Sequence, residues 1–102
     1  MEVEEVTVGL PQDYELSNYP NPFNSTTTLC YRLPISCYIS LRICDIYGKL
    51  IRTLVEGERP AGYHSVRWDG RDDSDRPVAS GVYLYRLRVG TFVRTGKMAL
   101  IR

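Results

Sequence analysis

The chain lacks several features that would point to a particular class of protein. No apolar run approaches the ~18 residues that a membrane-spanning helix needs, so we expect no membrane insertion. The formal net charge is +1 over 102 residues, which leaves no basic surplus for nucleic acid. The opening Met1-Glu-Val-Glu-Glu lacks the positive and apolar regions of a signal peptide. We therefore expect either a cytoplasmic protein or, as the preferred interpretation, a piece of a longer exported one.

Side chains that bind metals or catalyse reactions are also scarce, with three cysteines and one histidine. Cys30, Cys37 and Cys44 form no Cys-x-x-Cys pair and are remote from His64, so we predict unpaired thiols on strands and no metal site. His64 has no nucleophile or orienting carboxylate at a recognisable spacing. We therefore expect no enzymatic activity and no cofactor.

The acidic loop at 69–77 is the one segment whose carboxylates could suggest calcium. It lacks the alternate-position ligands, the glycine and the final glutamate of a calcium-binding loop. Aspartates in such loops more often accept hydrogen bonds from their own backbone, so we interpret this segment as a set of turns.

From Thr26 onward, apolar and polar residues alternate with the period of two that half-buried strands show. No segment has the apolar stripe of an amphipathic helix. Short strands separated by turn residues predict an all-β fold, an immunoglobulin-like antiparallel β-sandwich of about seven strands. We expect Trp68 in its core, with His64 and Val66 on the same face and with the alternating Tyr83 and Tyr85 also packed inside. The expected strands lie at 26–33, 38–43, 50–55, 64–68, 82–89 and 92–101, with a loop at 56–62.

The segment 16–24 (Leu-Ser-Asn-Tyr-Pro-Asn-Pro-Phe-Asn) interrupts this pattern. Its two prolines lack a backbone donor and its asparagines favour side-chain turns, so it cannot be a helix or a central strand. We interpret it as an ordered lead-in that holds the domain clear of a preceding cargo. Residues 1–16 are acidic and irregular, and we interpret them as a linker remnant or a short edge strand near 6–10. The domain itself is expected to occupy residues 17–102.

Four motifs follow one another at specific distances along the chain. They are Asn18-Tyr-Pro-Asn-Pro-Phe-Asn24, Asp45-Ile-Tyr-Gly48, Ala61-Gly-Tyr-His-Ser-Val-Arg-Trp-Asp-Gly70 and Ser80-Gly-Val-Tyr-Leu-Tyr-Arg-Leu87. In this order and spacing they resemble the type A C-terminal sorting domains of type IX secretion. The Trp-Asp-Gly loop and the Gly-Val-Tyr strand are also similar to the immunoglobulin-like domain of flagellar hook-capping proteins.

The resemblance to sorting domains implies a module at the end of a larger exported cargo protein. Such a domain crosses the inner membrane with its host, folds in the periplasm and is read by the outer-membrane secretion machinery. It is commonly cleaved afterwards, and the cargo is released or joined to the cell surface. The location implied for this chain is therefore secreted or at the cell surface, via the periplasm. The three cysteines depart from the family's usual residues.

The ending of the chain also resembles the terminal strand of these sorting domains. A terminal edge strand can present backbone groups or a row of side chains to a receptor, so we predict that it is the recognition site. Alternation would place Met98 and Leu100 on one face, with Lys97, Ala99 and Ile101 on the other. In the simpler alternative this strand closes the sandwich and its basic end is solvated. The candidate recognition residues are Lys97, Met98, Ala99, Leu100, Ile101 and Arg102.

Two other functions remain open at this stage. The domain could be a structural module that binds neighbouring copies of itself in a surface filament or a hook-cap-like structure. It could also be an accessory carbohydrate-binding domain if Tyr83 and Tyr85 formed an exposed platform. We further expect Cys30 and Cys44 to share the outer face of the first hairpin, where they could pair between molecules.

Overall fold

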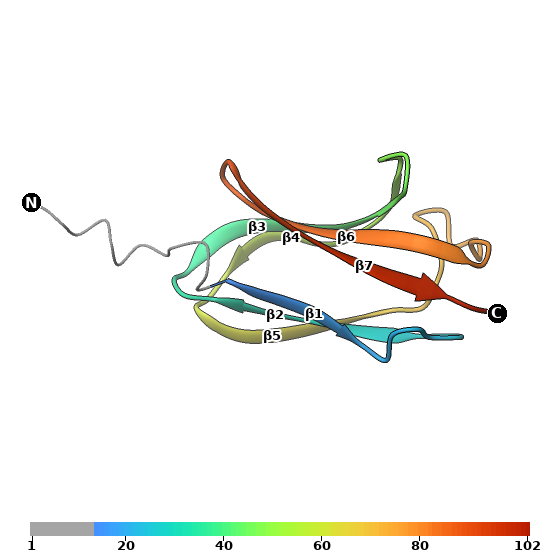
Figure 1. The fold of residues 1–102 in the computed structure, drawn as a ribbon. Coiled ribbons are helices and arrows are strands. Elements are labelled where there is room, and N and C mark those ends of the chain that lie inside the picture. The colour runs from blue at the N-terminus through green and yellow to red at the C-terminus, as the bar shows by residue number, and fades with distance from the viewer. Residues whose placement is uncertain (1–13) are drawn as a thin grey trace, which may run out of the picture.

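The computed structural model describes residues 14–102, which form seven strands in two antiparallel sheets (Figure 1). This architecture confirms the predicted all-β sandwich. The described residues contain no helix that could cross a membrane. The strands are β1 (Glu15–Tyr19), β2 (Thr27–Leu33), β3 (Cys37–Asp45), β4 (Leu50–Arg59), β5 (Gly62–Trp68), β6 (Gly81–Val89) and β7 (Phe92–Leu100).

One sheet has the strand order β1-β2-β5 and the other has the order β4-β3-β6-β7. The chain therefore crosses between sheets after Leu33, and β2 and β3 do not form a hairpin. The expectation that Cys30 and Cys44 share a hairpin face is wrong. Cys30 is exposed on the three-stranded sheet, whereas Cys44 is buried on the four-stranded one. Alternation predicts which face a side chain occupies, but it cannot predict which sheet its strand joins.

The core lies between the sheets and is built from alternate residues of the strands. Trp68 is 1% exposed, and its ring lies 5.8 Å from that of Phe23 and 5.5 Å from that of Tyr83. Its indole nitrogen donates a hydrogen bond to the Arg71 carbonyl at 2.9 Å. The prediction that Trp68 forms part of the core is confirmed.

Tyr83 and Tyr85 are both buried, which confirms them as core residues. The Tyr83 hydroxyl donates to the carbonyl of Ala79 at 2.6 Å, so its polar end is satisfied. Burial raises the pKa of both tyrosines, because the ionised phenolate would be poorly solvated there.

Two boundaries differ from the expected ones. β4 continues to Arg59, through most of the loop expected at 56–62, because it pairs with β3 along that whole length. Cross-strand pairing has overridden the weak strand propensity of the glycine and glutamates there. At the other end, Tyr14 is buried and β1 includes residues 15 and 16, which the sequence pattern assigns to the linker. The edge strand considered near 6–10 lies outside the described residues.

Candidate recognition site

The C-terminal strand β7 is an edge strand of the four-stranded sheet, paired with β6 from Phe92 to Leu100. Met98 and Leu100 are each 1% exposed, whereas Lys97 and Ile101 point to solvent. The predicted alternation of faces is confirmed. The recognition role of the strand remains a prediction.

The proline-rich lead-in lies against the free edge of this strand. The backbone N–H of Phe23 donates to the Ala99 carbonyl at 3.0 Å, and Ile101 N–H donates to the Phe23 carbonyl at 2.9 Å. The side-chain amide of Asn21 donates to the Lys97 carbonyl at 3.2 Å and accepts from Ala99 N–H at 3.1 Å. The lead-in therefore does not serve as a simple spacer. Prolines cannot supply edge donors, so the residues between and after them do so.

Phe23 fixes this contact to the core. Its side chain is 3% exposed and packs beside the Trp68 ring, so its backbone is held at the strand edge by burial. The segment is braced from the other side as well. Asn18 donates to Thr27 Oγ1 at 3.1 Å, and that hydroxyl donates to the Pro20 carbonyl at 2.8 Å. Both proline peptide bonds of the segment are cis.

Arg102, the last candidate residue, folds back onto the loop between β5 and β6. Its backbone N–H donates to Ser80 Oγ, and its guanidinium donates to the carbonyls of Val78 and Gly70, each at 2.9 Å. Gly70 has a φ of 75° and lies so close to this guanidinium that a Cβ there would clash with it. The basic end of the chain thus holds a loop in place and is not merely solvated.

Residues 20–24 and 97–101 together form one composite surface, which we call the strand-cap surface. It carries a shallow groove of about 380 Å³ and a smaller one of about 150 Å³. The larger groove is lined by Pro20, Pro22, Phe23, Asn24 and Ile101, and the smaller by Asn21, Val82, Lys97, Met98 and Ala99. The lead-in and the C-terminal strand therefore meet in space, although Asn21 and Lys97 are 76 positions apart in the sequence. No periodicity in the sequence signals that contact.

The other part of β7 has no such cap. Along a strand, the backbone N–H and C=O groups of every second residue point to the same side. Those of Lys97 and Ala99 point away from β6, so those of Val93 and Thr95 point to the same outer edge. Within residues 14–102, no hydrogen bond joins these two residues to a neighbour on that side. Among residues 14–102, the backbone edge at Val93 and Thr95 therefore carries no hydrogen-bonded cap, and we call it the bare edge.

The acidic loop is organised by its own backbone, as predicted. Asp72 Oδ1 accepts from the N–H groups of Ser74 at 2.9 Å and Arg76 at 3.0 Å, and Asp69 Oδ1 accepts from Arg71 N–H at 3.2 Å. The hydrogen bond from Arg76 is the main reason that the pKa of Asp72 lies below its ordinary value. Among the described residues, no three His, Cys, Asp or Glu side chains gather as metal ligands.

The same loop caps the opposite edge of the four-stranded sheet. Asp73 N–H donates to the Ile51 carbonyl at 2.9 Å, and its carboxylate accepts from Thr53 N–H at 3.2 Å. Arg52 donates to the Asp72 carbonyl at 3.0 Å. Both outer strands of this sheet thus carry a cap.

His64 behaves as the packing residue that the sequence suggested. It is half-buried, its ring stacks on Tyr31 with centroids 5.2 Å apart, and Nε2 donates to the Pro60 carbonyl at 2.7 Å. The thiol of Cys37 is half-buried, and burial together with the Glu58 carboxylate raises its pKa. A thiol with a raised pKa is a poor nucleophile at neutral pH.

Comparisons with known proteins agree with this architecture. The sequence model of a family described as FlgD Ig-like domain matches residues 31–91, which confirms the immunoglobulin-like fold. PorZ of Porphyromonas gingivalis, described as an essential bacterial surface component of the type-IX secretion system, is similar at 24% identity with a TM-score of 0.59. FlgD from P. aeruginosa is similar at 22% identity with a TM-score of 0.57.

Each of these two likenesses covers 85% of this chain. The chain spans 11% of the PorZ chain and 64% of the FlgD chain. At such identities the likeness shows the fold alone. No curated protein matches the sequence.

Proposed function

We propose that this chain, which belongs to the family of FlgD Ig-like domains, is a non-catalytic sorting and anchoring module. It directs an exported host protein through the outer membrane to the cell surface, by way of the periplasm. Its partners are the outer-membrane secretion machinery and a cargo domain on its N-terminal side. Support comes from the four motifs that resemble type A sorting domains. The likeness of fold to PorZ, which is described as part of type-IX secretion, is consistent with it.

The observation that carries this proposal is the meeting of the lead-in motif and the terminal strand in the strand-cap surface. The edge groups at 97–101 that the lead-in binds are already satisfied, so a receptor has little backbone to pair with there. Recognition would rest on the side chains of Lys97 and Ile101 and on the apolar groove beside them. This differs from the strand addition that an open terminal strand would allow.

The polar groups that could suggest catalysis have structural uses, which supports the non-catalytic part of the proposal. The aspartates of 69–77 hold turns, and His64 bonds a backbone carbonyl. A reaction site would need a nucleophile, a base and an orienting group within reach of one another.

The test is an export assay in a host with a working type IX system. Residues 14–102 are fused behind a reporter, and the outward-facing double variant Lys97→Glu/Ile101→Glu is compared with the unchanged domain. We expect at least about tenfold less reporter at the surface, since the loss of one hot-spot side chain at the centre of an interface costs about 2 kcal/mol or more, and tenfold corresponds to ~1.4 kcal/mol. Neither change touches the buried Met98 or Leu100, unlike removal of the whole strand.

The matched control is Tyr63→Glu/Arg67→Glu, on the outer face of β5 in the other sheet. It should export normally. Equal export of the strand-cap variant and this control, with both folded by circular dichroism, would overturn the proposed recognition.

A structural module that assembles with neighbouring copies is the second candidate, and the bare edge of Val93 and Thr95 favours it. An exposed edge can accept a strand from another molecule. Sedimentation of the purified chain at high concentration tests this, with Thr95→Pro as the variant that removes an edge donor. Oligomers that become monomers in the variant support assembly, and a wild-type chain that stays monomeric contradicts it.

A further inference from the structure

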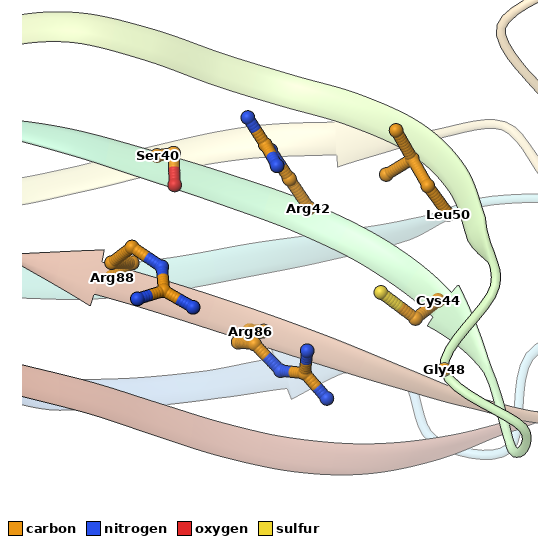
Figure 2. Close-up of a pocket in the computed structure, with 7 residues that line it drawn as sticks. All are labelled: Ser40, Arg42, Cys44, Gly48, Leu50, Arg86 and Arg88. Atoms are coloured by element: carbon orange, nitrogen blue, oxygen red, sulfur yellow. The ribbon is translucent and has the colours of Figure 1, made fainter.

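The outer face of the four-stranded sheet carries a cluster of cations that the export proposal does not use. The residues belong to β3, β6, the β3–β4 turn and the start of β4, and they surround a cavity of about 120 Å³ (Figure 2). We call it the arginine pocket. It is lined by Ser40, Arg42, Cys44, Gly48, Leu50, Arg86 and Arg88.

The register of the sheet forces like charges together in this pocket. Arg42 lies directly opposite Arg86, and Arg88 lies two residues further along β6 on the same face. Like charges directly opposite each other on neighbouring strands destabilise a sheet. The fold therefore holds a repulsion that a bound anion would relieve.

Among the described residues, one of the three guanidinium groups has a counter-charge. Arg42 forms an ion pair with Glu56, at 3.3 Å. Within residues 14–102, neither Arg86 nor Arg88 forms a hydrogen bond or an ion pair through its side chain. Lys97 on the next strand, whose partner in the ladder is Leu84, adds a further positive charge to this face. The pocket is thus left with two unneutralised arginines.

The shape of the pocket suits a small ligand. Figure 2 shows the three arginine side chains over the same face of the sheet, with Ser40 and Cys44 on β3 to either side of Arg42. Ser40 and Cys44 are short and nearly buried, which leaves a hollow below the longer arginines. A cavity of about 120 Å³ has room for several waters or for one oxyanion.

We propose that the arginine pocket binds a phosphate group. Two free guanidinium groups offer about ten N–H donors, more than the roughly four acceptor sites of a carboxylate can use. A phosphate monoester carries close to two negative charges and three acceptor oxygens, which match two arginines that each bind in a bidentate manner. The Ser40 hydroxyl on the floor of the pocket supplies a further donor. This inference does not depend on the export role.

Inorganic phosphate is the first probe, added to the full chain and followed by amide chemical shifts at constant pH and ionic strength. We expect saturable shifts at 40–44 and 86–88, with a dissociation constant on the order of 1–10 mM for so open a site. The double variant Arg86→Gln/Arg88→Gln should bind at least about tenfold more weakly. The control Arg67→Gln, an exposed arginine on the other sheet, should leave binding unchanged.

Three results would overturn the proposal: shifts that never saturate, acetate binding as tightly as phosphate, or equal weakening by Arg67→Gln. Thermal unfolding provides a second measurement. Phosphate should raise the Tm of the wild type more than that of the Arg86→Gln/Arg88→Gln variant, because its general salting effect acts on both proteins alike. An equal rise in both would also count against a specific site.

Two further ligands test which kind of phosphate-containing molecule the pocket binds. Glucose 1-phosphate represents a sugar phosphate, and vesicles that contain phosphatidic acid represent a lipid headgroup, with phosphatidylcholine vesicles as their control. Tighter binding of one of them than of inorganic phosphate, lost in the double variant, identifies the class of ligand and supports the site. Binding of the vesicles that persists in the double variant would place the lipid contact elsewhere and contradict the proposal for that ligand.

Discussion

The two halves of β7 have the same strand geometry but opposite surroundings. Between Lys97 and Ile101, the lead-in accepts or donates four hydrogen bonds at the edge, whereas no residue of 14–102 forms one with the outward backbone groups of Val93 and Thr95. The cap on β4, at Ile51 and Thr53, comes from the loop between β5 and β6. Within the described part of the chain, the edges of the four-stranded sheet are therefore capped where a neighbouring loop reaches them.

The length of the connections explains the difference. The capped part of the sheet lies near the longest connections between strands, 20–26 and 69–80, which have enough residues to fold back over an edge. The bare part directly follows the two-residue turn 90–91, which only reverses the chain between β6 and β7. Whether an edge of the sheet is capped thus depends on the length of the nearby loop, in which asparagine and aspartate side chains form hydrogen bonds to the edge strand.

The largest expected effect is a difference in the free energy of unfolding between a variant that removes the cap and a variant in the bare half of β7. Phe23→Ala should lower the free energy of unfolding by about 3–5 kcal/mol, because it empties a buried aromatic site and releases the cap. Val93→Ala, on the bare half, should cost less than about 1 kcal/mol, because the side chain is 38% exposed. Urea unfolding measures both. Similar losses for the two variants would mean that the cap does not depend on Phe23.

Gly96 lies where the bare and capped stretches meet, and it should be the next most sensitive position. Its neighbour across the ladder is Tyr85, whose ring covers the place that a Cβ would occupy. Gly96→Ala should therefore destabilise the domain by about 1–3 kcal/mol through overpacking. The outward-facing Thr95→Ala is the control in a thermal melt, and an unchanged Tm for Gly96→Ala would contradict the close contact.

Asn21 tests the cap directly with a smaller change. Asn21→Ala removes two exposed hydrogen bonds to β7 and should cost about 1–2 kcal/mol. The Ala99 amide should then exchange with solvent at a rate close to that of Thr95. Asn24→Ala, which changes the same loop without a contact to the strand, should leave that rate unchanged. Slow exchange at Ala99 in the Asn21 variant would show that the backbone of Phe23 suffices.

The smallest expected effect is a pH dependence in the loop that caps β4. The folded pKa of Asp72 is lowered, so the ionised carboxylate stabilises the fold above the ordinary carboxyl pKa of about 4. That contribution disappears as the pH falls through the lowered value. Unfolding curves of the wild type and Asp72→Asn should therefore diverge above about pH 4 and converge in stronger acid. Parallel curves across this range would show that Asp72 has no such role.

Most of the strands could be predicted from the sequence, because alternation shows directly at positions such as Leu29, Tyr31 and Leu33. The extension of β4 could not, since its last residues have weak strand propensity and gain their structure from β3. The alternation of Met98 and Leu100 in the candidate site was also predictable. The cap on this strand could not be predicted, because the contact of Asn21 with β7 joins two segments that are far apart in the sequence.

The arginine pocket shows the same limit. Alternation on each strand is enough to predict outward faces for Arg42, Arg86 and Arg88. Their proximity follows only from β3 and β6 lying side by side, although the chain visits the other sheet between them. Strand order is a long-range property, and the period of two carries no information about it.

The positions of the first and last described residues have a mechanical consequence. Tyr14 contacts Phe92 at the start of β7, with ring centroids 4.9 Å apart, and Arg102 lies past the far end of that strand. Tension between these points runs parallel to the strands. Ladder hydrogen bonds in an antiparallel pair are perpendicular to the strands, so such tension shears many of them simultaneously and does not peel them one by one. The domain is therefore oriented to resist pulling along its length.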